Sequence, residues 1–444
     1  MSMYLSEIKQ KILMENRDMD IIIDTFKLVV NSVKEQKDTN NFSRTINMVP
    51  SGFRDLSPSS FDPRVVSIGP LHRHDEALQL FEDQKATYVD SLLQRVPSPP
   101  EQTLKECLLK VVASIDMIRA SYPRIEKAYS DTELSTMMVM DACFILEFIL
   151  MISKSSDDQK QLLRGSPMIY DLVLVENQIP FLALNLIFDL TIAKSQLTTT
   201  LNELLLDLVQ FFNIFETKLT VSDRTVDFHL DHILGFLETC YWPSLKYTPS
   251  EGLPGSAIHS TIELNRAGII FTPYRDERWQ MTMEYKSSKF PYFSWFWFKP
   301  SLRMPVLRID NITELILRNL IAYERTSTYP SYMTSYAAAM DMLVDTQEDI
   351  AKLIESKVVL NHLGSNQKAT SMIKSICAPN RLENFYYVDQ CQELDEYYNR
   401  YWPKNIAVLK GTYFSSPWNT IALLAGIILF ALTVVQTIYT VNAA

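Results

Sequence analysis

The stretch Asp141–Leu150 reads DACFILEFIL, and it is apolar on most sides when wound as a helix. A helix that lacks a broad polar face must be enclosed by other elements, because exposed apolar surface is unfavourable in water. Asp131 or Thr132 can cap the start of this helix. We therefore expect a central helix that begins near residue 131 and runs through Leu150, with the rest of the domain packed around it.

The segments on both sides of this stretch also have helical periodicity. Apolar residues recur at helical spacing over residues 78–96 and again over 104–115, with prolines between the two stretches. Downstream, Asp171–Leu190 reads DLVLVENQIPFLALNLIFDL. Because a residue before proline is pushed out of the helical region, we expect two helices with a break at Asn177–Pro180.

The remaining chain predicts a mainly α fold: a large helical domain with a small β-hairpin element and a C-terminal transmembrane helix. Apolar and polar residues alternate from Trp279 to Lys286, and Leu302–Val306 can supply a partner strand, which places the β element at about residues 269–309. Gly268 can terminate a short helix before it. Further helices are expected over residues 201–215, 229–240, 261–267, 313–323, 332–343 and 348–355.

Composition limits the class of protein. With 444 residues, of which 47% are hydrophobic, the chain can bury a large core. A net charge of −10 argues against a nucleic-acid surface, which needs clustered lysine and arginine. The five cysteines lack CxxC spacing, and so sparse and odd a set favours a reducing compartment over a disulfide scaffold.

The tail Ile421–Val441 reads IALLAGIILFALTVVQTIYTV and carries no charge. As a helix it would be roughly 31 Å long, about the thickness of a bilayer's hydrocarbon core. The alternative is a buried core helix, which usually keeps a polar face. We expect a membrane anchor, with aromatic residues near both of its ends. The anchor residues singled out are Trp418, Ile421, Leu424, Ile428, Leu432, Val435 and Tyr439.

The orientation of this anchor follows from flanking charge. Lys404 and Lys410 precede it, and the positive-inside rule then places the bulk of the chain in the cytosol, with the plasma membrane as one candidate membrane. The first residues contain no run that resembles a signal-peptide core. We expect an N-terminal arm at 1–45, a helical domain at 46–412 and the anchor at 413–444.

Eight blocks of the chain form an ordered set. They are VVSIGPLHR (Val65–Arg73), DACFILEF (Asp141–Phe148), DLVLVENQIPF (Asp171–Phe181), STIELNRAGIIF (Ser260–Phe271), MPVLRIDNITELILRNLIAYE (Met304–Glu324), TSYAAAMDMLVDTQEDIAKL (Thr334–Leu353), HLGSN (His362–Asn366) and YFSSPW (Tyr413–Trp418). Together these blocks resemble the plant family called domain of unknown function 247. The resemblance implies a largely helical, plant-restricted protein with a hydrophobic anchor, and it carries over no catalytic residues. Some grass members of that family are tied to pollen–stigma self-incompatibility.

The connection between the two expected strands departs from the short polar connection typical of that family. Phe290–Pro300 reads FPYFSWFWFKP, with seven aromatic residues in eleven. It can be buried core, an exposed recognition loop, or a segment in the lipid headgroup layer. As a recognition loop, its partner-binding residues would be Phe290, Tyr292, Phe293, Trp295, Phe296, Trp297 and Phe298.

Two histidine pairs are candidate metal ligands. His72 and His74 lie two residues apart, and His229 and His232 share a face if they lie on a helix. Neither pair has an evident third ligand in the sequence, so we favour structural histidines and expect no metal site.

Polar residues inside apolar runs are the other candidates. Glu176, Asn177 and Gln178 precede Pro180, and the amides can bond the backbone that the break frees. Glu147 can be a buried acid with a raised pKa, although pairing with an arginine or lysine is favoured. The chain has no GxSxG, GxxxxGK or GxGxxG pattern, and no cofactor is expected.

Two functions are compatible with these observations. The first is a membrane-anchored recognition or scaffold protein without catalysis, of which a pollen-side determinant of self-incompatibility is the sharpest version. The second is an uncharacterised membrane-associated enzyme with a polar site around His229, His232 and Glu176. The first is favoured by the family resemblance, the missing catalytic patterns and the aromatic loop.

Overall fold

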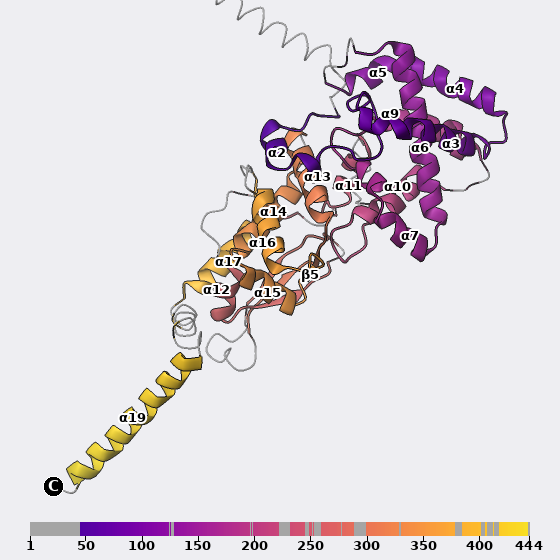
Figure 1. Cartoon of the computed structure of the whole chain (residues 1–444). Helices are drawn as coiled ribbons and strands as arrows, with labels where there is room; N and C mark the ends of the chain where they lie inside the picture. Colours follow the sequence, from indigo (N-terminus) through magenta and orange to yellow (C-terminus); the bar gives the residue numbers. More distant parts are fainter. Residues whose placement is uncertain are drawn as a thin grey trace, which may run out of the picture.

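The computed structural model describes residues 45–442 except 124, 126–127, 196, 198, 222–230, 245–247, 251, 253–258, 277, 288–298, 328–329, 378–383, 401–404, 406–411 and 413–416. The described chain forms an elongated, mainly helical body, and one long helix, α19 (Pro417–Asn442), extends away from one end of it (Figure 1). The mainly α prediction is confirmed.

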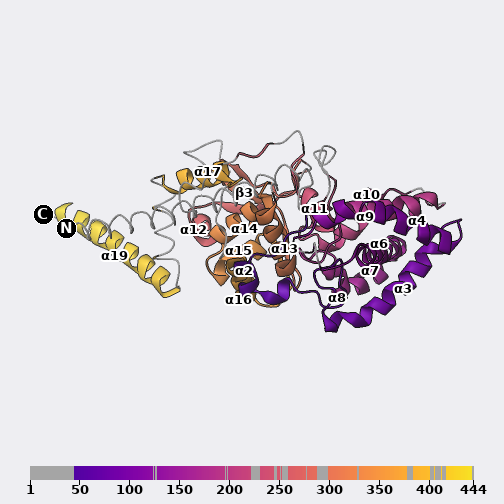
Figure 2. The same ribbon diagram turned by 90° about the horizontal axis from the view of Figure 1, so that it is seen from above.

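The helix α6 (Asp131–Lys154) is the centre of the N-terminal half. It packs against α3 (Gln79–Leu93), α4 (Pro100–Ala113), α9 (Phe181–Leu190) and α10 (Leu201–Val209). Seen along its axis, α6 lies inside a ring of these neighbours (Figure 2). The predicted central helix is therefore confirmed.

The cap of α6 differs from the predicted one. Ser130 is the N-cap: its hydroxyl accepts the N–H of Glu133, and the Glu133 carboxylate accepts the N–H of Ser130. This reciprocal pair satisfies two N–H groups that a helix start leaves without partners. Asp131 and Thr132 instead occupy the first turn, where an acidic side chain suits the positive end of the helix dipole.

The predicted break between the two helices at Asn177–Pro180 is confirmed. The helix α8 (Pro167–Asp171) ends before it, and α9 begins at Phe181, directly after Pro180. The other short elements of this half are α2 (Ser51–Leu56), η1 (Pro58–Ser60), η2 (Glu76–Leu78), α5 (Ile115–Ala120), α7 (Asp157–Arg164), η3 (Ile192–Lys194) and η4 (Gln210–Phe212).

Two predicted helices are shorter than their apolar stripes indicated. The helix α10 ends at Val209 because the chain beyond η4 becomes extended and pairs with a strand: Ile214 accepts the N–H of Arg308 at 2.8 Å. The helix α11 (Ile233–Thr239) begins only after His232, which is its N-cap. His229 lies outside the described residues.

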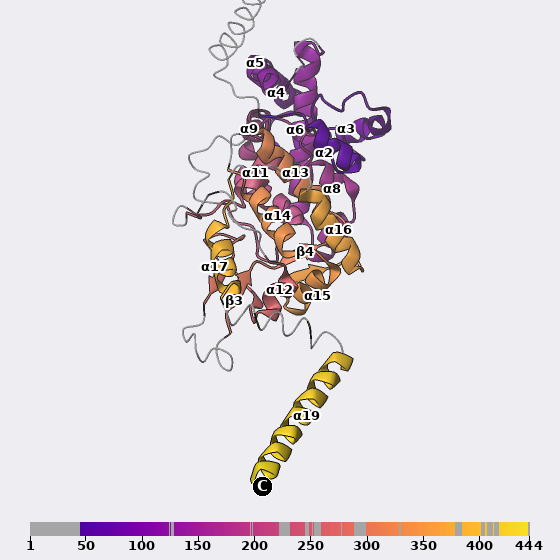
Figure 3. The ribbon, with the colours of Figure 1, turned by 90° about the vertical axis from the view of Figure 1, so that its left-hand side faces the viewer.

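The C-terminal half groups helices beside two small sheets (Figure 3). The helix α12 ends just before Gly268, whose φ of +104° favours glycine, as predicted. The helices are α12 (Thr261–Arg266), α13 (Thr313–Thr326), α14 (Tyr332–Leu343), α15 (Gln347–Glu355), α16 (Asn366–Cys377) and α17 (Val388–Tyr398).

The predicted strand pair exists within a three-stranded sheet. The strand β2 (Glu284–Lys286) pairs antiparallel with β3 (Ser301–Met304), and Tyr285 lies opposite Leu302. The strand β1 (Ile270–Pro273), which was not predicted, pairs parallel with the other edge of β3. The first predicted strand is shorter than expected: residues 279–283 form a turn and loop before β2.

A second sheet, not predicted, joins distant parts of the chain. The strand β4 (Leu307–Ile309) pairs parallel with β5 (Val359–Asn361). On its other side β4 meets Phe215 through an isolated bridge. The buried apolar residues of both halves belong to one continuous cluster that extends from Ile46 to Leu394.

Candidate functional site

The residues of the predicted aromatic partner loop lie outside the described residues: Phe290, Tyr292, Phe293, Trp295, Phe296, Trp297 and Phe298. The description resumes at Lys299, and the carbonyl of Pro300 accepts the N–H of Ile270 at the start of the three-stranded sheet. This segment therefore directly precedes the central strand of that sheet.

The predicted anchor residues lie on α19 and are exposed. Trp418 is 78% exposed and Tyr439 is 74% exposed, near opposite ends of the helix. Between them Ile421, Leu424, Ile428, Leu432 and Val435 are all about half exposed or more. Large apolar side chains of a folded domain are normally buried, so the exposed apolar surface of this helix differs from that of the body.

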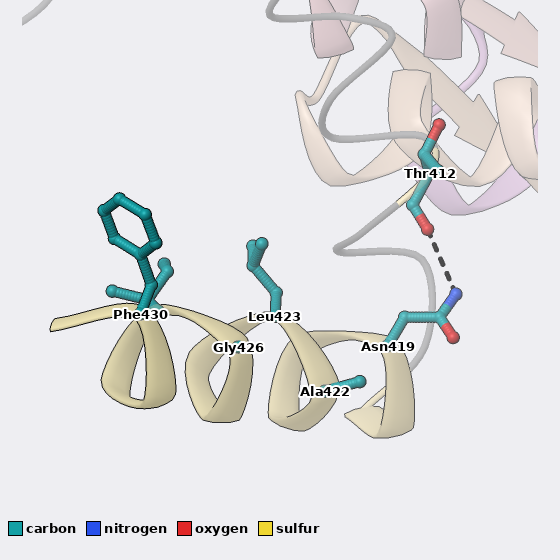
Figure 4. Close-up of a pocket in the computed structure, with 7 residues that line it drawn as sticks. Thr412, Asn419, Ala422, Leu423, Gly426 and Phe430 are labelled. Carbon is teal, nitrogen blue, oxygen red and sulfur yellow. Dashed lines mark hydrogen bonds between the residues drawn. The ribbon is translucent and has the colours of Figure 1, made fainter. Parts of the chain in front are cut away.

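A shallow groove of about 580 Å³ runs beside the first half of α19. Figure 4 shows Asn419 turned toward Thr412, to whose carbonyl its amide donates at 3.0 Å, while Leu423 and Phe430 project from the helix. The other lining residues are Ala422, Gly426 and Ile427. The lining has no ionisable side chain, so this groove offers no acid, base or metal ligand.

A different set of polar residues is buried in the body. We use the name polar seam for Asp141, Asp171, Glu176, Asn177 and Gln178, each at most 3% exposed. Four of them bind the backbone of the segment 45–73. This arrangement brings together three of the sequence blocks, namely those that begin at Val65, Asp141 and Asp171.

Asp171 and Asn177 hold the middle of that segment. The Asp171 carboxylate accepts the three consecutive N–H groups of residues 64–66 at 2.8–3.0 Å. Asn177 accepts the N–H of Ile68 at 2.7 Å and donates to the carbonyl of Val66 at 3.0 Å. Backbone groups of an irregular segment are thereby paired within the core, where an unpaired group would be costly.

Asp141, on α6, holds the next residues together with Lys85 from α3. Its carboxylate accepts the N–H of Gly69 at 2.8 Å and the ammonium of Lys85 at 2.6 Å. Lys85 is fully buried and also donates to the carbonyl of Ser67 and to Glu82. Burial lowers the pKa of Lys85, and the adjacent Asp141 carboxylate opposes this shift.

The side chain of Gln178 forms hydrogen bonds with backbone groups at the break between the helices, as predicted. Its amide donates to the carbonyls of Leu172 and Leu174, and its side-chain oxygen accepts the N–H of Leu234. Its own carbonyl lies so close to Gly69 that an added Cβ there would approach it to 2.5 Å. Gly69 also has a φ of +73°, so glycine is required at this position for two reasons.

Glu176 holds the start of the segment. One oxygen accepts the N–H of Val49 at 2.7 Å, and the other accepts the Arg54 guanidinium at 2.6 Å and lies 3.5 Å from Nε2 of His72. Burial acts to raise the pKa of Glu176, but the contacts with His72, Val49 and Arg54 outweigh it, and the pKa lies below its usual value. Glu176 is therefore an ionised structural carboxylate.

The first histidine pair is separated by its contacts, and of the second pair only His232 lies within the described residues. His72 faces Glu176, whereas His74 stacks on Tyr129 with ring centroids 5.5 Å apart. In His232, Nδ1 accepts the N–H of Gly235, and Nε2 lies 3.1 Å from the carbonyl of Thr45. Both ring nitrogens of His232 are thus occupied, with the proton on Nε2. Burial lowers the pKa of His232 to about 4.

Glu147, the predicted buried acid of α6, is paired. The Arg95 guanidinium donates to both of its oxygens, at 2.7 and 2.5 Å. A bidentate pair of this kind is strong and directional. The favoured alternative, pairing with an arginine or lysine, is confirmed.

A second pair of buried carboxyl groups was not predicted. Glu324 on α13 accepts the N–H groups of Met333 and Thr334 and the Thr334 hydroxyl. Glu238 on α11 is near enough for its charge interaction with Glu324 to be appreciable. Burial, followed by the proximity of Glu324, raises the pKa of Glu238 well above its usual value, and burial raises that of Glu324 to about 7.

The geometry of the polar seam indicates a structural tie. Its oxygens are occupied by backbone N–H groups, arginine and lysine, so no carboxylate there is left to act as a base. Within the described ranges, no group of three or more His, Cys, Asp or Glu side chains is arranged to hold a metal ion. The sequence signal that was overlooked is the isolated aspartate that opens each of two apolar runs, Asp141 and Asp171.

Comparison with known proteins gives family relationships but no activity. The profile of a family described as plant protein of unknown function, DUF247, matches residues 46–432. A UPF0481 protein of Arabidopsis thaliana is 25% identical over 421 residues, which cover 88% of this chain and 84% of that protein. A putative UPF0481 protein of the same plant is 29% identical over 181 residues, which cover 40% of this chain and 32% of that protein. No solved structure matches.

The family match spans all three sequence blocks that meet at the polar seam and extends into α19. The predicted family resemblance is therefore confirmed. The chain belongs to the DUF247 family of plant proteins of unknown function.

Proposed function

We propose that this protein is a membrane-anchored, non-enzymatic recognition or scaffold protein. The observation that carries the proposal is the state of α19. Within the described residues, two helices are long and apolar enough to cross a membrane; 83% of the apolar window of α6 is buried in the body, against 0% for α19. A helix that exposes this much apolar surface is stabilised by a lipid environment.

The polar residues of α19 fit a lipid environment. The hydroxyls of Thr433 and Thr437 donate to the carbonyls of Leu429 and Thr433, four residues earlier, at 2.8 and 2.7 Å. These hydroxyls therefore need no water, and all backbone groups within a helix are satisfied internally. Trp418 and Tyr439 lie near the two ends of the span, where interfacial aromatic residues are favoured.

The anchor is tested by flotation of membranes from cells that express the full chain. The double variant Leu424→Arg/Ile428→Arg should leave the floating fraction, because an arginine at the centre of a spanning helix costs about 2.5 to 3.5 kcal/mol. Leu80→Arg/Leu162→Arg is the matched control, since these side chains are 84% and 78% exposed on the body. Flotation of the Leu424/Ile428 variant at the wild-type level would refute the anchor.

The recognition part of the proposal rests on the aromatic composition of Phe290–Phe298. Aromatic anchors contribute much of the affinity of protein interfaces. We expect Trp295→Ala/Trp297→Ala to weaken capture of a partner from the native plant tissue while the thermal unfolding midpoint stays unchanged. Unaltered capture by this variant would remove the loop as the interface.

The sharpest version of the proposal is a pollen-side determinant of self-incompatibility. Its support is the family resemblance and the unusual aromatic segment. It predicts that differences between alleles are concentrated in residues 290–300. Alleles that differ mainly elsewhere would contradict it.

The proposed orientation places the body in the cytosol, supported by Lys404 and Lys410 upstream of α19. Protease added to sealed vesicles of known sidedness should digest the body when the cytosolic face is outside. Protection of the body in such vesicles would reverse the orientation without affecting the anchor.

A further inference from the structure

A groove of about 720 Å³ lies between α13 and α16. The N-terminal half of each helix contributes to it, and Leu56 from α2 closes one side. The lining residues are Leu56, Asp310, Asn311, Glu314, Arg318, Leu363, Ser365, Gln367, Lys368, Ser371, Met372 and Ser375.

Arg318 of α13 is the distinctive residue of this groove. Its side chain is only 2% exposed, and two of its three nitrogens have partners. Nε donates to Glu314 at 2.8 Å, and Nη2 donates to the Ser375 hydroxyl at 3.0 Å. Nη1 is buried and has no hydrogen-bond partner among the described residues. A buried guanidinium donor without an acceptor is costly, which points to an acceptor supplied from outside the chain.

The first turns of α16 add further positive character. Ser365 and Lys368 line the groove at the start of this helix, where the helix dipole favours an anion, although the Ser365 hydroxyl already accepts the N–H of Lys368 at 3.4 Å. The ammonium of Lys368 makes no ion pair with a described residue. Ser371, one turn further, presents an exposed hydroxyl on the same groove.

The two acidic residues of the groove are already engaged. Asp310 accepts the N–H groups of Ile312 and Thr313 at the start of α13, and one of its oxygens lies 3.3 Å from Nε of Arg308. Glu314 is paired with Arg318. Arg308 and Arg318 therefore offset these two carboxylates, which leaves the charge of Lys368 without a counterion.

We propose that this groove binds the phosphate group of a small phosphate ester. The donors come from Arg318, Lys368, Ser371 and the start of α16, and a tetrahedral oxyanion with several oxygens can accept from more of them than a planar carboxylate can. The volume exceeds that of a phosphate ion. The side chains of Leu56, Leu363 and Met372 provide apolar surface for the organic part of the ester.

The test uses the full chain in detergent micelles, titrated calorimetrically with inorganic phosphate and with glycerol phosphate. Wild type should bind both, and glycerol phosphate more tightly. Lys368→Gln and Ser371→Ala change exposed side chains, so folding is retained, and each should weaken binding, Lys368→Gln by about tenfold because a charge-assisted contact is lost. Lys352→Gln, a change of the same charge on α15 outside the groove, should bind as wild type.

A variant that is expected to strengthen phosphate binding makes the test more specific. Glu314→Gln removes a negative charge from the groove and should strengthen phosphate binding. The proposal is overturned if wild type binds neither phosphate compound, in which case water alone satisfies Arg318. It is also overturned if Lys368→Gln/Ser371→Ala binds as wild type, or if acetate binds as tightly as phosphate.

Discussion

The helices α6 and α19 are similar in length and apolar character, with 24 and 26 residues, yet one is the buried centre of the body and the other is exposed. The difference lies in their few polar residues. The helix α6 carries Asp141 and Glu147, which need Lys85 and Arg95 from neighbouring elements. Residues 418–440 of α19 carry no acidic or basic side chain. Charged residues that require protein partners commit an apolar helix to a folded interior.

The largest expected difference between the two helices is in the free energy of unfolding lost when a phenylalanine in each is replaced by alanine. Phe144 of α6 is fully buried and packs edge-to-face on Tyr88 at 5.0 Å. Phe144→Ala should lower the free energy of unfolding by about 4 kcal/mol through lost burial and the cavity left behind. Phe430→Ala in α19, where the side chain is 71% exposed, should leave it unchanged. Denaturant unfolding in detergent measures both, and equal effects would break the comparison.

The next effect concerns the charge that commits α6 to the interior. Asp141→Asn retains an acceptor for Gly69 but leaves the buried Lys85 with Glu82 as its remaining carboxylate, and we expect a loss of about 3 kcal/mol. Adding Lys85→Met should recover part of this loss, since the unpaired charge is then removed. A double variant less stable than Asp141→Asn would show that the Lys85 contacts with Ser67 dominate instead.

The folding stability of the body should depend on pH, whereas membrane association through α19 should not. Burial raises the pKa of Glu324 to about 7, so its contribution to stability is fully present below about pH 4.5 and is lost as the pH rises through about 7. The pKa of Glu238 is also raised, well above its usual value, so its contribution is lost in the same direction as the pH rises. His232 acts in the opposite direction, because its stabilisation is lost as the pH falls from about 6.5 through about 4. Membrane flotation through α19 should not change over this range.

Glu238→Gln isolates the carboxyl contribution, because the effect of His232 cancels when the variant is compared with wild type. The variant should gain stability relative to wild type as the pH rises above about 4.5, since it cannot ionise beside Glu324. The measurement is the difference in unfolding free energy at each pH. A difference that is independent of pH would mean that the pKa of Glu238 is the same in the folded and the unfolded protein.

The smallest effect tests the start of α6. Ser130→Ala removes the cap of a helix on which several others pack, and should cost about 1 kcal/mol of global stability. Ser156→Ala removes an equivalent cap from α7, a short helix with no buried residue, and should change global stability much less. Hydrogen exchange at the two helix starts distinguishes a local effect from a global one.

Local patterns predicted most of the helices. The periodicity around Asp141–Leu150 placed α6, and the proline rule placed the break before Phe181. The predicted cap, Asp131 or Thr132, was one or two residues off, because several capping residues follow one another in SDTE, and only the complete Ser130–Glu133 pairing distinguishes them.

Partners far apart in sequence could not be predicted in the same way. The strands β4 and β5 have three residues each and pair across about fifty residues, too short and too distant for a periodic signal. Glu176 was identified as a residue that needs partners, but its partner Val49 lies 127 residues away. The charge of Arg318 was likewise unremarkable until the fold buried it between α13 and α16.

The attachment of residues 64–66 to Asp171 has a consequence for biosynthesis. The partners are 107 residues apart, so at about 5 to 20 residues per second a ribosome needs roughly 5 to 20 seconds to deliver the acceptor after the donors. During this delay the segment 45–73 cannot bind Asp171. The helices synthesised between residue 73 and Asp171 therefore lack this segment as a packing partner until Asp171 has been made. Nascent chains arrested before residue 171 should therefore be cleaved by protease within residues 45–73, and chains arrested well beyond residue 190 should resist it.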